Sequence, residues 1–340
     1  MSGVPRRRHR IAGRAGAVPR RGAGVRRRVA TVPPPPGRQR GVAVLTAMLV
    51  VTVGTILAVN LMWEATLDQR RTAAALAADQ GLMYVQGAEA WAADILRQDL
   101  VDSPDTDHIG EEWSLDLPPL PVDGGVIAGR LEDLQGRFNL NNLTGVNGTE
   151  DPMAVAQFER LLTLLELDPA LAGAVVDWLD TDVDLRFPDG GEDAAYADTD
   201  PQYRTANASI TSPSELMAVN GFDRHAYRLL APYVTALPPG TTINVNTATD
   251  VVLASLSETL DLSQAESLVE ERADVGFADV GTVFSGLVEP EMLQRIDGVT
   301  EHFLLTATVT LGTTQLTMRS VLQRDPSGIT RALFRSLGVE

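Results

Sequence analysis

The chain has 340 residues, which is enough for one large domain or two modest ones. It contains no cysteine, and this excludes a disulfide framework, a thiolate metal site and a cysteine nucleophile. The first 40 residues hold twelve Arg and no acidic residue, so the remainder carries 16 of the 28 basic side chains against 45 acidic ones. Such an acidic remainder would repel nucleic-acid phosphates and attract divalent cations.

Residues 1–37 combine Arg clusters with Gly, Ala and the proline run 33–36, and they show no apolar periodicity. This composition predicts a disordered leader. Membrane topology explains the arginines better than nucleic-acid binding does, because an apolar segment follows them directly.

That segment is an uncharged run from Val42 to Trp63, followed by Glu64. As a helix rising about 1.5 Å per residue it would extend roughly 33 Å, enough to cross the hydrocarbon core of a bilayer. A signal peptide has a shorter apolar core, about 7–15 residues, and a small-residue cleavage site; no Ala-x-Ala motif follows this run. A single membrane anchor is therefore favoured, and the basic flank places its N-terminus in the cytoplasm.

Apolar residues recur at spacings of three and four from Leu67 to Leu100, which predicts that the helix continues with one apolar face. Ser103-Pro104-Asp105 should end it. A helix from about Val42 to Leu100 would exceed roughly 80 Å. We expect its first half in lipid and its second half against a globular head.

Beyond a proline-rich connector at 118–121, the chain changes pattern three times. Residues 126–134 predict one strand, and residues 302–311, 315–323 and 329–337 predict two or three more. Between them lies a helical block, with helices expected at 152–167, 169–180, 213–220, 223–235, 248–257, 263–273, 279–287 and 290–296. We expect an α+β fold in which an all-α domain of roughly 160 residues is inserted into a small antiparallel sheet.

The densest acidic segment lies between Asp177 and Asp200. Within it Asp180, Asp182 and Asp184 alternate much as calcium-loop ligands do, although the spacing is not that of an EF-hand. On spacing alone, a calcium site and a solvated acidic loop explain these residues equally well. A glycosidase pair of carboxylates is disfavoured, because 5% aromatic content gives no basis for a sugar-binding groove.

Two stretches, 214–232 and 243–272, resemble helix-hairpin-helix repeats, which in other proteins grip DNA phosphates through glycine-rich hairpins. The hairpin after Ala254 has no glycine pair, and Glu258 and Asp261 stand where a phosphate would approach. Packing between protein segments is therefore the better interpretation.

The start of the apolar run resembles the processing site of type IV prepilins, where a basic leader ends in Gly before an apolar helix. In that class a membrane peptidase cuts after the glycine, here Gly41, and Val42 would become the N-terminus. The fifth mature residue, Glu in most members, is Thr46. A carboxylate in lipid is costly unless paired, and in these filaments it is thought to pair with the N-terminal amine of the subunit above. Thr46 thus points to a subunit at a filament tip, or away from the family.

From about Arg38 to the C-terminus, a series of motifs resembles the K-type minor pseudopilin of the type II secretion pathway. The motifs are 136–142 (GRFNLNN), 176–180 (VDWLD) with Glu192-Asp193, 203–207 (YRTAN), 212–216 (SPSEL), 221–222 (GF), 230–234 (LAPYV) and 243–248 (INVNTA). The resemblance implies a pilin-like long N-terminal helix on a small antiparallel sheet, an inserted α-domain that binds calcium, and a place at the pseudopilus tip beside the I- and J-type minor pseudopilins. The calcium ligands that it implies are Asp180, Asp182, Glu192 and Asp193, followed by Asp184, Asp198 and Asp200.

We therefore expect a single-pass inner-membrane protein with its C-terminal part in the periplasm. The expected segments are a cytoplasmic leader (1–41), a transmembrane half-helix (42–63), a periplasmic half-helix (64–102), a connector with the first strand (103–137), the inserted α-domain (138–299) and the C-terminal strands (300–340). The leader is longer than is typical of prepilins, so the sequence leaves its true translation start open.

The expected partners are the I- and J-type minor pseudopilins, the prepilin peptidase and the inner membrane, with no nucleic acid. We expect a filament subunit that initiates or caps the pseudopilus during export of folded proteins, not an enzyme. The alternatives are a minor pilin of a type IV pilus or DNA-uptake system and, less favoured, a membrane-anchored periplasmic metal-dependent enzyme.

Overall fold

The computed structural model describes residues 40–116, 118–273 and 275–338. The segment predicted to be a disordered leader, 1–37, lies outside these residues. The chain divides into two compact units, Met1–Thr66 and Leu67–Glu340.

Helix α1 is the longest element and runs unbroken from Arg40 to Asp102. In the first unit its apolar side chains are exposed throughout. Thr46, Thr52 and Thr55 donate their hydroxyls to helix carbonyls four residues earlier, at 2.8–3.1 Å. These hydroxyls are therefore satisfied within the helix and need no water, as a lipid environment requires.

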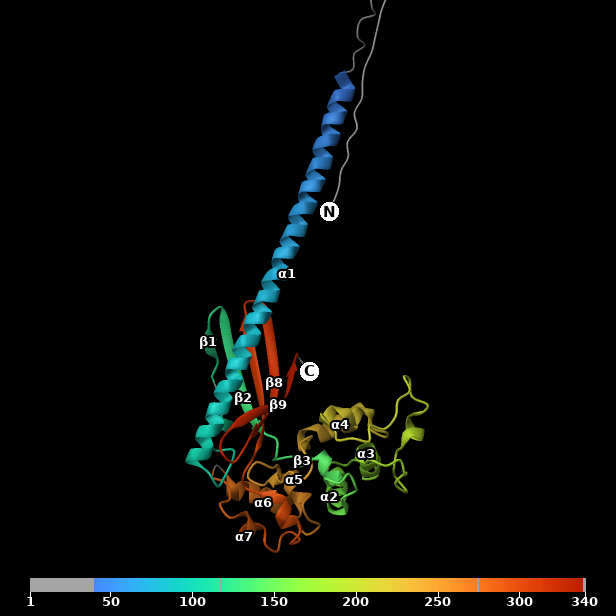
Figure 1. Cartoon of the computed structure of the whole chain (residues 1–340), viewed down its shortest axis with the longest axis vertical. Coiled ribbons are helices and arrows are strands. Elements are labelled where there is room, and N and C mark those ends of the chain that lie inside the picture. The colour runs from blue at the N-terminus through green and yellow to red at the C-terminus, as the bar shows by residue number, and fades with distance from the viewer. Residues whose placement is uncertain (1–39, 117, 274, 339–340) are drawn as a thin grey trace, which may run out of the picture. The chain divides into compact units, whose positions relative to one another are not determined.

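The second unit is built on a five-stranded antiparallel sheet of order β1-β2-β7-β8-β9 (Figure 1). Its strands are β1 (Leu120–Val122), β2 (Gly125–Asp133), β7 (His302–Leu311), β8 (Thr314–Arg324) and β9 (Thr330–Leu337). The predicted strand before the helical block and the three after it are confirmed. Edge strand β1 had been interpreted as connector because of its proline, which an edge strand tolerates.

The register of β2 on β7 explains how a long segment can be inserted into this sheet. Asp133 at the end of β2 pairs with Phe303 near the start of β7, and Leu134 N donates to His302 O at 3.0 Å. The chain thus leaves the sheet and returns to it at neighbouring positions. Because β2 and β7 pair directly with each other, the sheet is complete without any residue of the insert.

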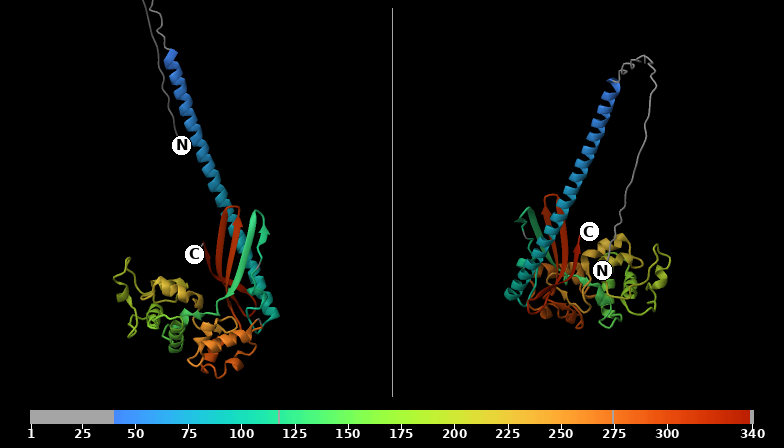
Figure 2. Two further views of the ribbon diagram at one scale, coloured as in Figure 1. Left: turned by 180° about the vertical axis from the view of Figure 1, so that it is seen from behind. Right: turned by 45° about the horizontal axis from the view of Figure 1, so that its top comes forward.

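Beyond Leu67, helix α1 lies along one face of the sheet, as Figures 1 and 2 show from three directions. Val85, Ala92 and Leu96 form a core there with sheet residues that include Phe303 and Leu305. Alternate residues of β7 are buried, as expected for a strand with one covered face. The predicted apolar face of the helix is therefore its sheet-facing side.

The insert contains two hydrophobic cores in sequence, the first within 138–234 and the second within 243–296. Around the first lie α2 (Pro152–Leu164), α3 (Leu171–Leu179) and α4 (Arg224–Leu230), and around the second lie α5 (Asp250–Ala254), α6 (Leu262–Arg272) and α7 (Val280–Phe284). The 3₁₀ turns are η1 (Glu112–Ser114), η2 (Leu140–Leu143), η3 (Asp193–Tyr196), η4 (Pro213–Ala218), η5 (Ala231–Tyr233) and η6 (Met292–Arg295). The helices predicted at 213–220 and 290–296 are thus 3₁₀ turns.

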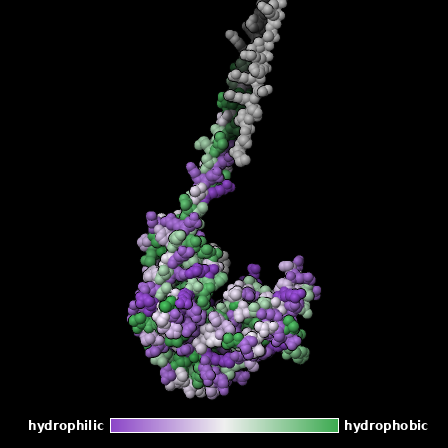
Figure 3. All heavy atoms as spheres, in the orientation of Figure 1, coloured by the Kyte–Doolittle hydropathy of each residue, from purple (hydrophilic) through white to green (hydrophobic). Residues whose placement is uncertain are grey.

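Two short parallel strand pairs, which were not predicted, hold the ends of the two cores. They join β3 (Phe138–Asn139) to β4 (Val234–Thr235), and β5 (Ile243–Asn244) to β6 (Ile296–Asp297). On the visible face of the second unit, hydrophilic and hydrophobic residues are interspersed (Figure 3).

Asparagines of the resemblance motifs act as structural connectors within the insert. The buried Asn141 side chain bonds the backbone of Ile210 and Leu237, and Asn139 accepts from Leu237 N at 2.9 Å. Asn244 joins the insert to the sheet through Asp133 Oδ2 at 2.9 Å. These motifs therefore serve the fold.

Candidate functional site

The predicted processing junction lies in the first turn of α1, where Gly41 and Val42 are exposed. A Cβ built on Gly41 would meet nothing within 4 Å. Glycine costs about 1 kcal/mol relative to alanine inside a helix, and the described fold gives no packing reason for it at this position. Gly54 and Gly87 of the same helix are equally free of neighbours, so Gly41 is the predicted cleavage residue by its place after the basic leader and not by its packing.

The segment that follows has the length and composition of a membrane span. Within Gly41–Asp102 an 18-residue window reaches a mean hydropathy of 2.5, and none of it is buried. A soluble core helix would be largely buried. The exposed apolar surface therefore fits a single-pass membrane anchor.

The acidic segment forms an irregular loop between α3 and η3. Asp180 caps the end of α3, where its N donates to Val176 O at 2.9 Å. The fully buried Asp177 accepts hydrogen bonds from Arg186 N at 3.2 Å and Gly191 N at 2.8 Å. Asp177 was not predicted as a ligand. Its hydrogen bonds tie the loop at Arg186 and at Gly191 to helix α3.

Three buried side-chain oxygens in this region accept no hydrogen bond from the described residues. They are Asp180 Oδ1, Glu192 Oε1 and Asn207 Oδ1. Asp180 and Glu192 are only 8% and 7% exposed. A buried anionic oxygen without a partner is costly, and a hard cation is the ligand that would satisfy oxygens of this kind.

The electrostatics of the two buried carboxyls agree with this interpretation. Burial, and then the charges of Asp182, Asp177 and Glu192, raise the pKa of Asp180 to about 7. Burial also raises the pKa of Glu192. Burial is the first cause of both shifts, and neighbouring carboxylates add to it.

Further contacts bring the loop segments together. Asn207 Nδ2 donates to Asp182 O at 2.7 Å, and Thr205 Oγ1 contacts Glu192 Oε2 and Asp193 Oδ1, both at 3.1 Å. Asn207 adopts a left-handed backbone with φ of 44°, which asparagine tolerates well. It was not predicted as a ligand, although it ends the 203–207 motif.

The other predicted ligands are exposed or already contact other groups. Asp182 Oδ1 accepts from Asp184 N at 2.8 Å, while Asp193 Oδ2 lies 3.7 Å from Arg204 Nε. Asp182, Asp184, Asp198 and Asp200 are all exposed. Asp180, Glu192 and Asn207 are thus the residues of this region whose buried oxygens have no hydrogen bond from the described residues and are available to a cation.

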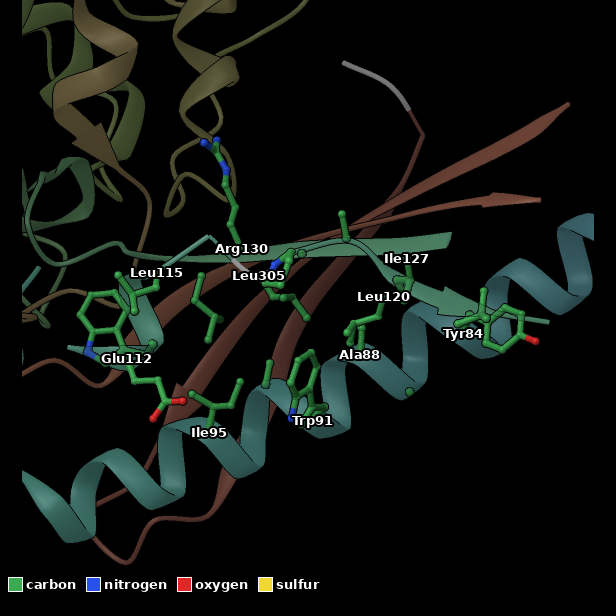
Figure 4. Close-up of a pocket in the computed structure, with 18 of the residues that line it drawn as sticks. Tyr84, Ala88, Trp91, Ile95, Glu112, Leu115, Leu120, Ile127, Arg130 and Leu305 are labelled. Atoms are coloured by element: carbon green, nitrogen blue, oxygen red, sulfur yellow. The ribbon is translucent and has the colours of Figure 1, made fainter. Parts of the chain in front are cut away.

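An apolar groove of about 250 Å³ lies between α1 and strands β1 and β2. In Figure 4, Ala88, Trp91 and Ile95 of α1 face Leu120 and Leu305 across it. Glu112 and Arg130 are the charged residues of its lining. The other described residues that line the groove are uncharged.

Comparison with known proteins identifies the family. A family model described as "Type II secretion system (T2SS), protein K" matches residues 136–239, and a second of the same description matches residues 243–295. These are close to the limits of the two cores of the insert.

Relatives and a solved structure extend the similarity to most of the chain. The Type II secretion system protein K of Pseudomonas aeruginosa is 36% identical over 88% of this chain and 93% of its own, and that of Aeromonas hydrophila is 32% identical over 84% and 93%. A chain in the crystal structure of the GspK-GspI-GspJ complex from the enterotoxigenic Escherichia coli type 2 secretion system superimposes with a TM-score of 0.72. It is 26% identical, and the match covers 79% of this chain and all of that one. The chain therefore belongs to the type II secretion system protein K family.

Proposed function

We propose that this protein is a minor pseudopilin that initiates or caps the pseudopilus of a type II secretion system during export of folded proteins. The observation that carries this proposal is the match, over its full length, of a chain from a solved GspK-GspI-GspJ complex. We assign this chain the partners that the complex implies, namely the I- and J-type subunits of its own system. The role is mechanical, and no enzymatic activity is assigned to it.

Two features support a position at the filament tip. Thr46 Oγ1 donates to Val42 O at 3.1 Å and to Ala43 O at 3.0 Å, so this side chain is directed to its own helix. It offers no anion to the N-terminal amine of a subunit above. The insert, with two cores beyond the sheet, adds a bulk that is easier to seat on the end of a filament than to stack within it.

The proposal includes processing by a prepilin peptidase between Gly41 and Val42, with the leader in the cytoplasm and the globular part in the periplasm. The apolar helix from Val42 would then remain in the inner membrane and pack with partner helices. Calcium in the insert is part of the same proposal. Asp180, Glu192 and Asn207 would hold the ion, with Asp182 and Asp193 beside them, and the ion would supply charge compensation.

Processing is tested by the intact mass of the protein purified from membranes of strains with and without the peptidase. We expect a mass that begins at Val42 in the first strain, and the uncleaved mass in the second. A mass that begins upstream of Gly41 in both strains would contradict the pseudopilin assignment.

The system itself is tested by co-purification and by deletion. We expect the protein to co-purify with the I- and J-type subunits, and its deletion to stop secretion of folded proteins into the medium. If deletion left secretion intact and abolished surface pili or DNA uptake, the protein would be a minor pilin instead.

A further inference from the structure

A second acidic cluster lies outside the insert, where helix α1 ends. It consists of Asp99 in the last turn of α1, and Asp107 and Glu111 in the segment that follows. One carboxylate oxygen from each of the three residues lies within 4.8 Å of the other two. Asp107 is 1% exposed and Glu111 is 9% exposed, so this is not a solvated charge run.

One buried arginine compensates part of this charge. Arg324, the last residue of β8, is 3% exposed, and its Nη2 lies 2.6 and 2.7 Å from the two oxygens of Asp107. Its Nη1 donates to Asp99 Oδ2 at 2.8 Å. A single guanidinium thus serves two carboxylates, and it makes no contact with the third among these ion pairs.

The third carboxylate is satisfied on one side only. Glu111 Oε2 accepts from Trp113 Nε1 at 2.7 Å and from His108 N at 3.0 Å. Glu111 Oε1 is buried and accepts no hydrogen bond from the described residues, and His108 Nε2 lies 3.6 Å away from it. A buried carboxylate oxygen without a hydrogen bond, in a cluster with two other carboxylates, is costly unless a positive charge or a proton compensates it.

Solvent can reach the cluster through an acidic cavity. The cavity has a volume of about 300 Å³ and is lined by Asp99 and Glu111 together with Asp94, Asp102 and Glu112. Its charge would raise the local concentration of cations and lower that of anions. The cavity therefore brings solvent to the side chains of Asp99 and Glu111, while Glu111 Oε1 itself is buried.

We propose that Asp99, Asp107 and Glu111 form a site for a divalent cation of the calcium class, separate from the loop of the insert. The donor set is oxygen only, which suits calcium or magnesium and not a soft transition metal. Glu111 Oε1 would be the principal ligand, with one oxygen each from Asp99 and Asp107, and water from the cavity would complete the shell. Calcium fits better than magnesium because calcium tolerates an irregular ligand arrangement.

The position of the site indicates what the ion would do. Arg324 also donates to Leu96 O at 3.1 Å and to Thr300 O at 2.9 Å. Thr300 N in turn donates to Asp107 Oδ2 at 2.7 Å, just where the chain returns from the insert to β7. The cluster therefore joins the end of α1, the end of β8 and the exit of the insert, and a bound ion would fix this junction.

The first test counts calcium ions bound to the full chain in detergent by equilibrium dialysis. Glu111→Gln keeps the size of the side chain and removes its charge, so we expect it to bind one ion fewer than the wild type. Glu266→Gln makes the same change of charge on an exposed face of α6, and we expect it to bind the same number as the wild type. Equal counts in Glu111→Gln and the wild type would overturn the proposal.

The second test leaves the three proposed ligands unchanged, so it can be carried out even if Glu111→Gln does not fold. Trp113 Nε1 contacts Glu111 at 2.7 Å, so its indole should sensitise terbium bound in place of calcium. We expect Trp113→Phe to lose a large part of the tryptophan-excited terbium emission while it keeps the wild-type calcium count. Unchanged emission in Trp113→Phe would overturn the proposal.

Two variants separate the site from its alternatives. Asp180→Asn alters the loop of the insert. We expect this variant to keep the ion at Glu111, whether or not it loses an ion from the proposed loop site. If His108 were the charge that Glu111 needs, His108→Gln would destabilise the protein to the same extent with and without calcium. We expect instead that saturating calcium offsets most of the loss in His108→Gln, and no offset would argue against the ion.

Discussion

At the scale of single residues, the buried polar network between sheet and insert depends on pairings that the sequence did not reveal. Asn244 Nδ2 lies 2.9 Å from each of Asp107 O, Asp133 Oδ2 and Thr300 Oγ1. These partners are 56 to 137 residues away along the chain. Periodicity and motif spacing report local structure, so they could not reveal these long-range pairings of Asn244.

Replacing Asn244 by Asp should destabilise the protein strongly. The substitution puts a second carboxylate against the buried carboxyl of Asp133 and removes the donor to Asp107 O. Breaking such a network typically costs about 3 kcal/mol or more. Denaturant unfolding measures the loss, and Asn147→Asp, at an exposed turn position, should cost less than about 0.5 kcal/mol.

Asp133 also predicts how stability depends on pH. Burial raises the pKa of its carboxyl to about 6, against about 3.9 in the unfolded chain. The folded state therefore holds this proton up to about pH 6. The resulting contribution to the free energy of unfolding is full below about pH 4, declines between pH 4 and 6, and is gone above that.

The magnitude of that decline follows from the shift of about two pKa units, or roughly 3 kcal/mol. Unfolding of the wild type and of Asp133→Asn from pH 4 to pH 7 measures it. The variant should lack this part of the decline, even if its stability is lower at every pH. Parallel curves for the two proteins would show that Asp133 titrates normally.

At the scale of elements, long and strongly periodic segments were predicted well and short ones were not. The helix ending near 102 and the strands β2, β7, β8 and β9 follow from hydrophobic pattern alone. The two-residue strands β3 to β6 have no pattern of their own, because they exist only through pairing with a distant partner. Likewise, the signals for a helix start at Ser212 and Pro213 are the same for a 3₁₀ turn and an α-helix.

Within β2, two glycines give a matched test of the sheet. A Cβ at Gly125 would lie 1.8 Å from Thr310 O on β7, whereas one at Gly129 would have its nearest neighbour, Thr306 O, at 3.6 Å. Gly125→Ala should therefore push β2 from β7 and cost about 2–4 kcal/mol. Gly129→Ala should change stability by less than about 1 kcal/mol in either direction, and similar losses in both would indicate that alanine itself, not the clash, is the cause.

At the scale of the whole molecule, the sequence predicted the insertion of a helical segment into a sheet, but not its division into two cores. Pro238-Pro239-Gly240 does interrupt the chain between the two cores, but such a break marks a turn within one core as readily as a boundary between two. The acidic loop shows the same limit. Its carboxylates were recognised, but the sequence did not show that Asp180 and Glu192 are the buried ones among the predicted ligands. It also did not show that Asn207, 15 residues beyond Glu192, has a buried oxygen without a hydrogen bond.

Calcium should close this loop and protect it from proteolysis. Arg186 and Arg204 are trypsin sites within the segment whose limbs Asp180, Glu192 and Asn207 would join through the ion. With chelator, the charge of the two buried carboxylates is uncompensated, and we expect cleavage at both arginines at least tenfold faster than in calcium. Peptide mass analysis of a timed digest measures the two rates.

The variants identify which residues carry that protection. Asp180→Asn should be cleaved rapidly in calcium as well as in chelator, because it loses a charged ligand at the centre of the site. Asp189→Asn removes the same charge from an exposed position of the same loop, and should keep the wild-type response. Cleavage at equal rates with and without calcium in the wild type would mean that the loop is a solvated acidic segment. The loop would then be held by Asp177 and its hydrogen bonds to Arg186 N and Gly191 N, without help from an ion.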